Sequence, residues 1–184
     1  MAFQASFLVG LGVAAITLIT LALMLRSRKV GNAAVPQPLK QLDLERCVGK
    51  WYELARYENR FQRGRDNVTV YCEIRAFDRV EVIALGWKNG AVLRFKCRAK
   101  PLSSEGNKLK VSSFGLFRPG QYWILDRGDR YDWTIVGEPT GAYLWILTRE
   151  PQVPAGLQAR LVKQVETLGY DTTRLRFTSH RGAE

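Results

Sequence analysis

Histidine is almost absent from the sequence, and its scarcity excludes many common catalytic and metal-binding arrangements. The one histidine among 184 residues is His180, in a polar C-terminal tail. Neither a histidine-based catalytic triad nor a site with several histidine ligands can therefore form within one chain. The cysteines are spaced too widely for a zinc or redox motif. We expect no metal ion, no cofactor and no enzymatic activity.

Charged residues are absent from residues 7–25, an apolar run about as long as a bilayer-spanning helix. The run ends in Arg26, Arg28 and Lys29. A cleaved signal peptide is the alternative, but no lysine or arginine precedes the run, and it is longer than a usual signal core. We expect residues 1–29 to form an N-terminal transmembrane helix that anchors the protein in a membrane.

The rest of the chain divides by composition into three parts. Residues 30–41, with Gly31, Pro36 and Pro38, predict a short semi-extended linker. Residues 42–178 predict one domain, which at about 140 residues can bury around two thirds of its unfolded surface. Residues 179–184 form a polar tail.

Apolar and polar residues alternate from Val68 onward, a pattern typical of strands with one buried face. Segments with this pattern or a comparable apolar content are residues 49–56, 68–75, 80–87, 94–100, 108–111, 121–125, 133–136 and 143–148. Asn89-Gly90, Gly106-Asn107 and residues 118–120 predict hairpin turns. Eight antiparallel strands can close into a barrel that holds one small ligand.

A helix is predicted for residues 154–168. Leu157, Leu161, Val165 and Leu168 fall on one face of this segment, and Gly169 follows as a C-terminal cap. The helix therefore has one apolar face that can pack against the barrel.

Four ordered motifs carry a resemblance to a known family. They are residues 49–56 (GKWYELAR), 59–64 (NRFQRG), 131–136 (YDWTIV) and 143–149 (YLWILTR). Together they closely resemble the lipocalin family, and within it the bacterial and apolipoprotein-D-like branch, from about Leu42 to Thr178. The resemblance implies an all-β fold, an eight-stranded antiparallel up-and-down barrel. The helix would pack outside it, followed by a short strand near residues 174–177.

The resemblance also assigns structural roles to Gly49, Trp51, Tyr131 and Arg149. In the family the guanidinium that maps to Arg149 lies across the ring that maps to Trp51 and closes one end of the barrel. Such a cation–π contact contributes about 0.5 to 2 kcal/mol. The alternative is that Trp51 touches ligand at the floor of the cup.

The predicted inner wall of the barrel is apolar, with several small side chains that leave volume. Each methylene buried against such a wall contributes about 0.8 kcal/mol, which favours a single-chain lipid over a sugar or nucleotide. We expect a fatty acid or lysophospholipid; the alternative is that these residues fill the barrel. The predicted ligand-binding residues are Ala55, Val70, Cys72, Val82, Ala84, Phe95, Cys97, Val111, Tyr122 and Ile124.

Cys47, Cys72 and Cys97 cannot all pair, so at least one thiol is free. A Cys72–Cys97 disulfide is one possibility in an oxidising compartment, and small buried apolar side chains are the other. A thiol in an apolar cup is also the only unusual nucleophile in the chain, but an apolar setting raises its pKa and makes it inert.

Positive charge dominates, with 28 basic and 17 acidic residues and a formal net charge of +11. Arg60, Arg63 and Arg65 crowd a loop that in this fold lies across the barrel mouth, where they could meet a phosphate or carboxylate head group. A second group predicts contact with an anionic membrane surface, or else a solvated face. It comprises Arg94, Lys96, Arg98, Lys100, Lys108 and Lys110.

The resemblance implies a role in lipid storage, transport or maintenance of the cell envelope, with the domain exported to the periplasm. The positive charges after residue 25 instead favour the cytoplasmic side. Bacterial relatives carry a lipid-modified cysteine at the mature N-terminus, whereas no cysteine precedes Cys47 here. No recognition motif for nucleic acid accompanies the charge. A homodimer is possible, because family members often dimerise. The alternative function is a protein- or membrane-interaction module that uses the basic outer face and has a filled barrel.

Overall fold

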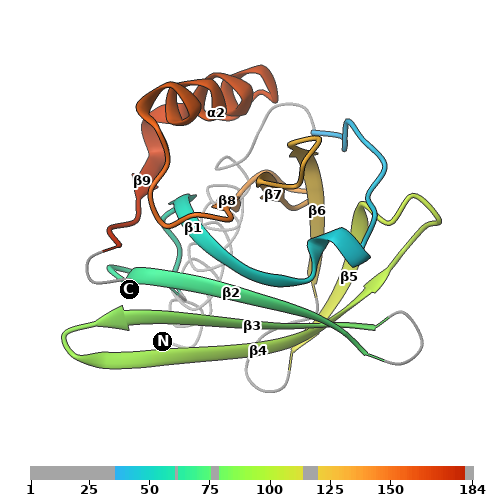
Figure 1. The fold of residues 1–184 in the computed structure, drawn as a ribbon, viewed down its shortest axis with the longest axis horizontal. Helices are drawn as coiled ribbons and strands as arrows, with labels where there is room; N and C mark the ends of the chain where they lie inside the picture. Colours follow the sequence, from blue (N-terminus) through green and yellow to red (C-terminus); the bar gives the residue numbers. More distant parts are fainter. Residues whose placement is uncertain (1–35, 61, 76–78, 114–119, 181–184) are drawn as a thin grey trace, which may run out of the picture. The chain divides into compact units, whose positions relative to one another are not determined.

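The computed structural model describes residues 36–60, 62–75, 79–113 and 120–180 (Figure 1). The chain divides into two units, residues 1–31 and 32–184, and every described residue belongs to the second. The transmembrane helix predicted within residues 1–29 lies outside the described residues, as does most of the turn predicted at 118–120. Within the described ranges, no helix is long and apolar enough to cross a bilayer.

The strands form one antiparallel sheet that closes on itself, as the sequence predicts. The sheet order is β2-β3-β4-β5-β6-β7-β8-β1-β9, and β1 also pairs with β2 to close the barrel. Its strands are β1 (Gly49–Tyr57), β2 (Asp66–Arg75), β3 (Arg79–Lys88), β4 (Ala91–Pro101), β5 (Lys108–Ser113), β6 (Gly120–Arg127), β7 (Trp133–Gly137), β8 (Leu144–Thr148) and β9 (Leu175–Phe177). The short β9 extends β1 beyond its pairing with β2.

Within the described residues, three helical segments accompany the strands: η1 (Glu45–Cys47), α2 (Ala155–Thr167) and η2 (Thr172–Arg174). The expected fold, an eight-stranded barrel with one helix packed outside it, is confirmed for the described part of the chain. The predicted turn at Asn89-Gly90 is also present, with φ of 50° and 77°, the positive values that a tight hairpin of this kind requires.

The α2 helix packs on one side of the barrel, the upper side in Figure 1. Leu161 and Val165 are buried there against outward-facing residues of the strands, including Ile135 and Ile146. The predicted apolar face of the helix is therefore the face that makes this contact.

A bulge in β1 changes which side chains face inward. Glu53 pairs with Leu147, but Ala55 pairs with Ile146, so one residue of β1 is unmatched between them. The bulge places Ala55 outside, in the cluster beneath α2. The prediction that Ala55 lines the cup is therefore wrong, because strict alternation from Trp51 did not allow for the extra residue.

Gly137 at the end of β7 has no room for a side chain. A Cβ there would lie 2.4 Å from the Tyr170 hydroxyl oxygen and 2.7 Å from Leu125 Cδ1. We expect Gly137→Ala to lower the free energy of unfolding by about 1 to 3 kcal/mol, as overpacking of a filled core does. Urea unfolding followed by tryptophan fluorescence measures this. Gly120→Ala is the control, because a Cβ at Gly120 meets nothing within 4 Å.

Candidate functional site

One end of the barrel is closed by the residues that the family resemblance singles out. The Arg149 guanidinium lies 3.7 Å from the centroid of the Trp51 ring, so the expected cation–π contact is present. Arg149 also donates to the carbonyl oxygens of Arg46 and Lys50, at 2.8 and 2.9 Å, and Trp51 Nε1 donates to that of Cys47 at 2.9 Å. These bonds tie η1 and the start of β1 to the end of β8.

Tyr131 completes the closed end. The guanidinium groups of Arg46 and Arg127 both lie over its ring, at 4.2 and 4.3 Å from the centroid. Its hydroxyl accepts a hydrogen bond from the Asp43 amide at 2.8 Å, which fixes the segment before η1. The described contacts of Tyr131 and Arg149 are thus structural.

The barrel interior is packed next to this end. Val80, Ala99 and Val111 form one row across β3, β4 and β5, and all three are buried. Leu44, from the segment before η1, and Cys97 of β4 belong to the same cluster. This cluster makes a solid floor.

The inward-facing side chains above the floor are more accessible to solvent. Val70, Ala84 and Phe95 form one row across β2, β3 and β4, and Cys72 and Val82 belong to the row below it. These five side chains are partly accessible to solvent, although each faces the inside of a closed barrel. Solvent therefore reaches the inward-facing side chains above the floor more readily than those of the floor itself.

Aromatic side chains from other strands contact this wall. Trp145 of β8 and Tyr122 and Ile124 of β6 share a cluster with Val70. Tyr122 meets Trp145 edge to face with ring centroids 5.1 Å apart, and Tyr143 stacks on Trp145 at 5.9 Å. Because Tyr122 and Ile124 pack against the same interior residues as Val70, both lie on the inner face of β6.

A buried ion pair lies on the β1 wall, and sequence analysis missed it. Glu53 and Arg56 are both fully buried, and Arg56 Nη1 donates to Glu53 Oε1. The Thr178 hydroxyl donates to the same oxygen at 2.6 Å, and Gln62 Nε2 donates to Glu53 Oε2 at 2.9 Å. Both carboxylate oxygens are therefore hydrogen-bonded, as a buried charge requires.

The same arginine holds the β1–β2 loop, residues 58–65. Arg56 Nη2 donates to the carbonyl oxygens of Gln62 and Arg65, at 2.7 and 3.2 Å, and to Glu58 Oε1 at 3.0 Å. Burial opposes ionisation of Glu58, but its hydrogen bond with Arg56 and the arginine's charge outweigh burial and lower its pKa. Trp145 Nε1 donates to Gln62 Oε1 at 2.8 Å, so the loop is also bonded to the aromatic wall.

Arg60 and Arg63 are exposed on this loop. Arg65 instead turns back and donates to the Gly86 carbonyl oxygen at 3.4 Å. The loop also meets the β3–β4 hairpin, because Lys88 Nζ donates to the Arg63 carbonyl oxygen at 3.2 Å. That Arg60 and Arg63 meet a ligand head group stays a prediction.

The predicted basic face is present in the structure with one exception. Arg94, Lys96, Arg98 and Lys100 are exposed on β4, and Lys110 is exposed on β5. Lys108 is only partly exposed: its Nζ lies 4.4 Å from the centroid of the Trp123 ring and donates to Gln37 Oε1 at 2.9 Å. Lys108 therefore covers an aromatic ring and is not available to a partner.

All three cysteines are free thiols. Cys72 and Cys97 lie on strands that flank β3, opposite Val82 from either side, so two strand spacings of about 4.8 Å separate them. A disulfide needs Cα atoms within about 7 Å, which excludes the Cys72–Cys97 bridge. Among the described residues, no cluster of three or more histidine, cysteine, aspartate or glutamate side chains could hold a metal ion.

We expect these thiols to be poorly reactive. Burial raises the pKa of Cys72 to about 11 and that of Cys97 to about 12. Burial and the nearby Cys72 raise the pKa of Cys47 to about 12. Because the thiolate is the nucleophile, alkylation of partly accessible Cys47 by iodoacetamide near neutral pH should be at least about a hundredfold slower than in the urea-unfolded chain. Fast labelling of Cys47 in the folded protein would contradict this.

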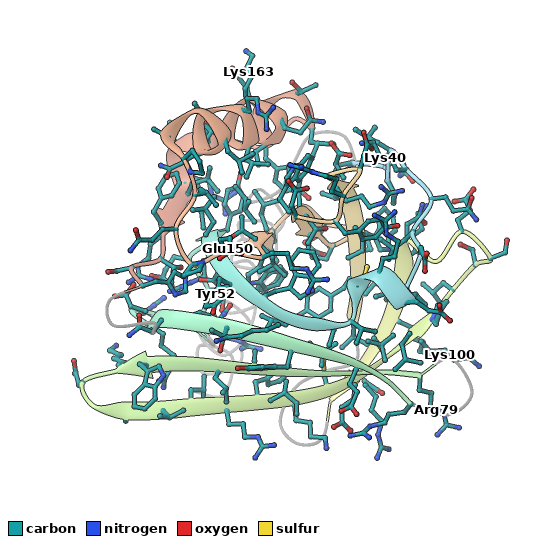
Figure 2. The ribbon with its side chains drawn as sticks, in the orientation of Figure 1. Lys40, Tyr52, Arg79, Lys100, Glu150 and Lys163 are labelled. Carbon is teal, nitrogen blue, oxygen red and sulfur yellow. The ribbon has the colours of Figure 1, made fainter. Side chains whose placement is uncertain are left out.

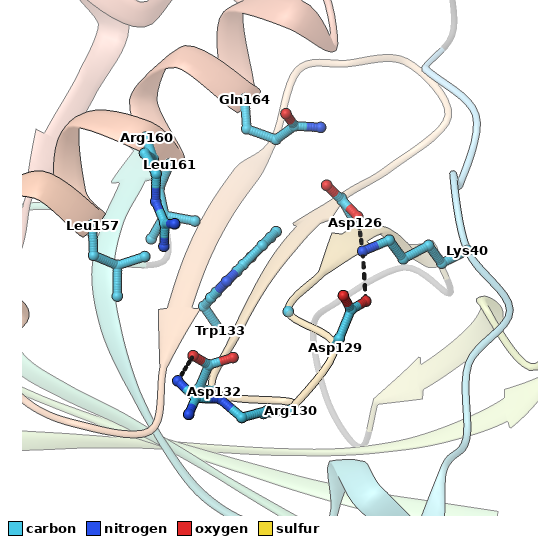
Figure 3. A pocket seen from close by; sticks show the side chains of 11 residues that line it. Lys40, Asp126, Asp129, Arg130, Asp132, Trp133, Leu157, Arg160, Leu161 and Gln164 are labelled. Carbon is cyan, nitrogen blue, oxygen red and sulfur yellow. Dashed lines mark hydrogen bonds and ion pairs between the residues drawn. The ribbon is translucent and has the colours of Figure 1, made fainter.

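A separate groove lies outside the barrel, between α2 and the β6–β7 turn (Figure 3). Its volume is about 510 Å³, and Trp133 and Leu161 form part of its wall. Lys40 bonds to Asp129 at 3.0 Å, and Arg130 lies 3.7 Å from Asp132. Because charges on its walls pair with one another, we place the candidate ligand site in the barrel interior instead.

Comparison with known proteins identifies the fold and the family. Residues 42–180 match the sequence profile of the lipocalin-like domain. The chain belongs to the lipocalin family. This lipocalin is 33% identical over 144 residues to the outer membrane lipoprotein Blc of Vibrio cholerae, covering 76% of the chain and 83% of the relative. It is 26% identical over 158 residues to apolipoprotein D of Mus musculus, covering 81% and 82%. The expected branch of the family is confirmed.

Solved structures agree with this assignment. Insecticyanin from Manduca sexta superposes with a TM-score of 0.66 over 83% of this lipocalin and 88% of that chain, at 15% identity. Apocrustacyanin C1 superposes with a TM-score of 0.60 over 81% and 92%, at 16% identity. At these identities the likeness concerns the fold alone.

Proposed function

We propose that this lipocalin binds a fatty acid or lysophospholipid reversibly in its barrel and serves lipid storage, transport or maintenance of the cell envelope. The observation that carries the proposal is the partly accessible row of Val70, Ala84 and Phe95 above a packed floor. An acyl chain lying along this wall would bury methylene groups at about 0.8 kcal/mol each.

The ends of the cup suit a ligand with one polar group. The floor near Val80 and Ala99 is apolar and buried, and would receive the end of the acyl chain. The β1–β2 loop at the mouth carries Arg60 and Arg63, which would bind the carboxylate or phosphate at the solvent end of the ligand. Arg56 does not serve as the head-group site, because its guanidinium is already bonded to Glu53, Glu58 and backbone carbonyls.

We further propose that residues 7–25 anchor the lipocalin in a membrane of the cell envelope. Relatives are named outer membrane lipoproteins, which supports an envelope location. This chain has no cysteine before Cys47, the last residue of η1, so its anchor would be the apolar peptide and not an attached lipid.

A carrier function fits the site better than catalysis. The inward cysteines have raised pKa values, and burial raises the pKa of the inward-facing Tyr122 as well. Groups held neutral in this way are weak nucleophiles and bases near neutral pH. The apolar wall therefore offers binding without an evident reactive group.

Photochemical labelling tests the proposal with the full-length protein. The chain is placed in phosphatidylcholine nanodiscs and irradiated with a fatty acid or lysophosphatidylcholine that carries a diazirine on its acyl chain. We expect saturable labelling of peptides from β2, β3, β4 and β6, and loss of the label when unmodified lipid competes. Label confined to residues 1–29, or barrel label that lipid does not displace, would refute the carrier function.

A further inference from the structure

The outer face of the β3–β4 hairpin carries an apolar strip beside a cationic one. Since paired residues of neighbouring strands lie on the same face, three successive rows can be read from the pairing: Trp87 with Val92, Leu85 with Arg94, and Ile83 with Lys96. These rows alternate with the inward pairs of the cup, so their side chains point away from the barrel.

The end of this face exposes large apolar side chains. Trp87 is 47% exposed and Val92, its direct partner, is 46% exposed. In Figure 1 the α2 helix lies on the upper side of the barrel and β3 and β4 on the lower side, and Figure 2 shows Lys163 on α2 apart from Lys100 on β4. A half-exposed tryptophan next to Lys88 is the combination found where proteins meet a lipid–water boundary.

The cationic strip places several like charges on one face. Glu81 of β3 lies 2.9 Å from Lys96 and 3.6 Å from Arg75, so two cations share this carboxylate. Lys100 and Lys110 lie directly opposite each other on β4 and β5, a like-charge pair that is unfavourable unless an anion lies nearby.

The chemistry of this face selects one kind of partner. A second copy of the chain would bring the same cations into contact, and a nucleic acid would leave Trp87 and Val92 without an apolar environment. An anionic lipid surface suits both the apolar and the cationic strip. Its phosphates would pair with the lysines and arginines, and Trp87 would lie at the boundary with the acyl chains.

We propose that the outer face of β3 and β4, with Trp87 and Val92 at its tip, docks on an anionic lipid surface. Lys88 at the same tip bonds to the mouth loop at Arg63, so docking brings the barrel entrance close to the lipid. If residues 7–25 are a membrane anchor, the ten residues from 26 to 35 reach at most about 35 Å, which keeps the barrel near the bilayer. Docking at this face does not depend on what the cup binds.

Lysine acylation in nanodiscs tests the docking with the full-length protein. Discs of phosphatidylcholine alone are compared with discs that also contain phosphatidylglycerol, and labelling by an amine-reactive ester is read by mass spectrometry. We expect Lys96, Lys100 and Lys110 to be labelled several-fold more slowly in the anionic discs, and the protection to vanish at high salt. Lys163 on α2 should label equally in both.

Matched variants separate docking from other causes. Arg94→Glu/Arg98→Glu and, independently, Trp87→Ser/Val92→Ser should abolish the protection, whereas Arg130→Glu/Arg160→Glu should leave it unchanged. Ala84→Phe, which fills the cup, should also keep it, so failure of lipid carriage and failure of docking give different results. Equal labelling in the two discs, protection that survives both hairpin variants, or protection that follows protein concentration and not lipid charge would overturn the proposal.

Discussion

Replacing Arg56 by methionine is expected to lower the free energy of unfolding by about 3 to 5 kcal/mol, the usual effect of leaving one partner of a buried ion pair alone. Arg56 and Glu53 are both fully buried inside the barrel. Without the guanidinium, the Glu53 carboxylate keeps hydrogen bonds from Thr178 and Gln62 but loses its only buried counter-charge among the described contacts. Urea unfolding of the full-length protein, followed by tryptophan fluorescence, gives the value.

Arg56→Met should also loosen the β1–β2 loop at the mouth of the barrel. Arg56 donates to the carbonyl oxygens of Gln62 and Arg65, so Arg56→Met removes bonds that hold residues 58–65 against the barrel. In the Arg56→Met protein, we expect the amides of this loop to exchange with deuterium faster than those of the β7–β8 turn. Arg63→Met is the matched control. Because Arg63 is exposed, its loss should change stability by no more than about 0.5 kcal/mol.

A double variant distinguishes the ion pair from a simple loss of packing. Glu53→Leu together with Arg56→Met removes both charges, and buried ion pairs replaced by apolar residues are often tolerated. We expect it to recover part of the stability lost in Arg56→Met, and not all of it, because Gln62 Nε2 and the Thr178 hydroxyl lose their acceptor. A double variant less stable than Arg56→Met would show that the Glu53 charge is not the source of the destabilisation.

The barrel and its inward-facing rows could be predicted from the sequence because both depend on local pattern, whereas the burial of Cys97 and Val111 in the floor could not. Alternation with period two along β2 to β4 gives the inward rows of Val70, Ala84 and Phe95 without knowledge of their partners. The apolar face of α2 follows in the same way from the spacing of Leu161 and Val165. The contact of Trp51 with Arg149 came from the family resemblance and not from pattern.

The hydrogen-bonded network around Glu53 and Arg56 could not be predicted. Its members are distant in sequence, and a bulge decides which residues of β1 face inward. Thr178 lies 125 residues from Glu53, and Trp145 lies 83 residues from Gln62. Alternation counted from Trp51 makes Ala55 inward and Arg56 outward, whereas the bulge reverses both. Taking both Trp51 and Glu53 as inward-facing predicts a buried carboxylate. A buried carboxylate needs a cation nearby, and this need was the one available signal for the ion pair.

Lys108 shows the same limit on the outer face. Pattern alone groups it with Lys110, since both point outward from β5. Its ammonium group is instead occupied by Trp123 of β6 and by Gln37, which lies 71 residues earlier. Whether a surface lysine is available to a partner thus depends on neighbours that period-two alternation does not identify.

Filling the cup provides the sharpest test of the carrier function. Ala84 lies between Val70 and Phe95 in the partly accessible row, so Ala84→Phe places a ring in the proposed cup. We expect photolabelling of the barrel by a diazirine fatty acid to fall at least about tenfold. The free energy of unfolding should change by less than about 1 kcal/mol, because a hollow accepts added atoms that a filled core does not. Ala159→Phe, at an exposed position on α2, is the matched control and should leave labelling unchanged.

The two measurements on Ala84→Phe together separate a cup from a filled barrel. If the interior were filled, the added ring would cost about 1 to 3 kcal/mol of stability by overpacking, and the wild-type barrel would not take up the probe. If labelling persisted in a stable Ala84→Phe protein, the lipid would lie elsewhere, and the row of Val70, Ala84 and Phe95 would not be its binding wall. Loss of labelling at unchanged stability is the result that only an open, lipid-binding cup produces.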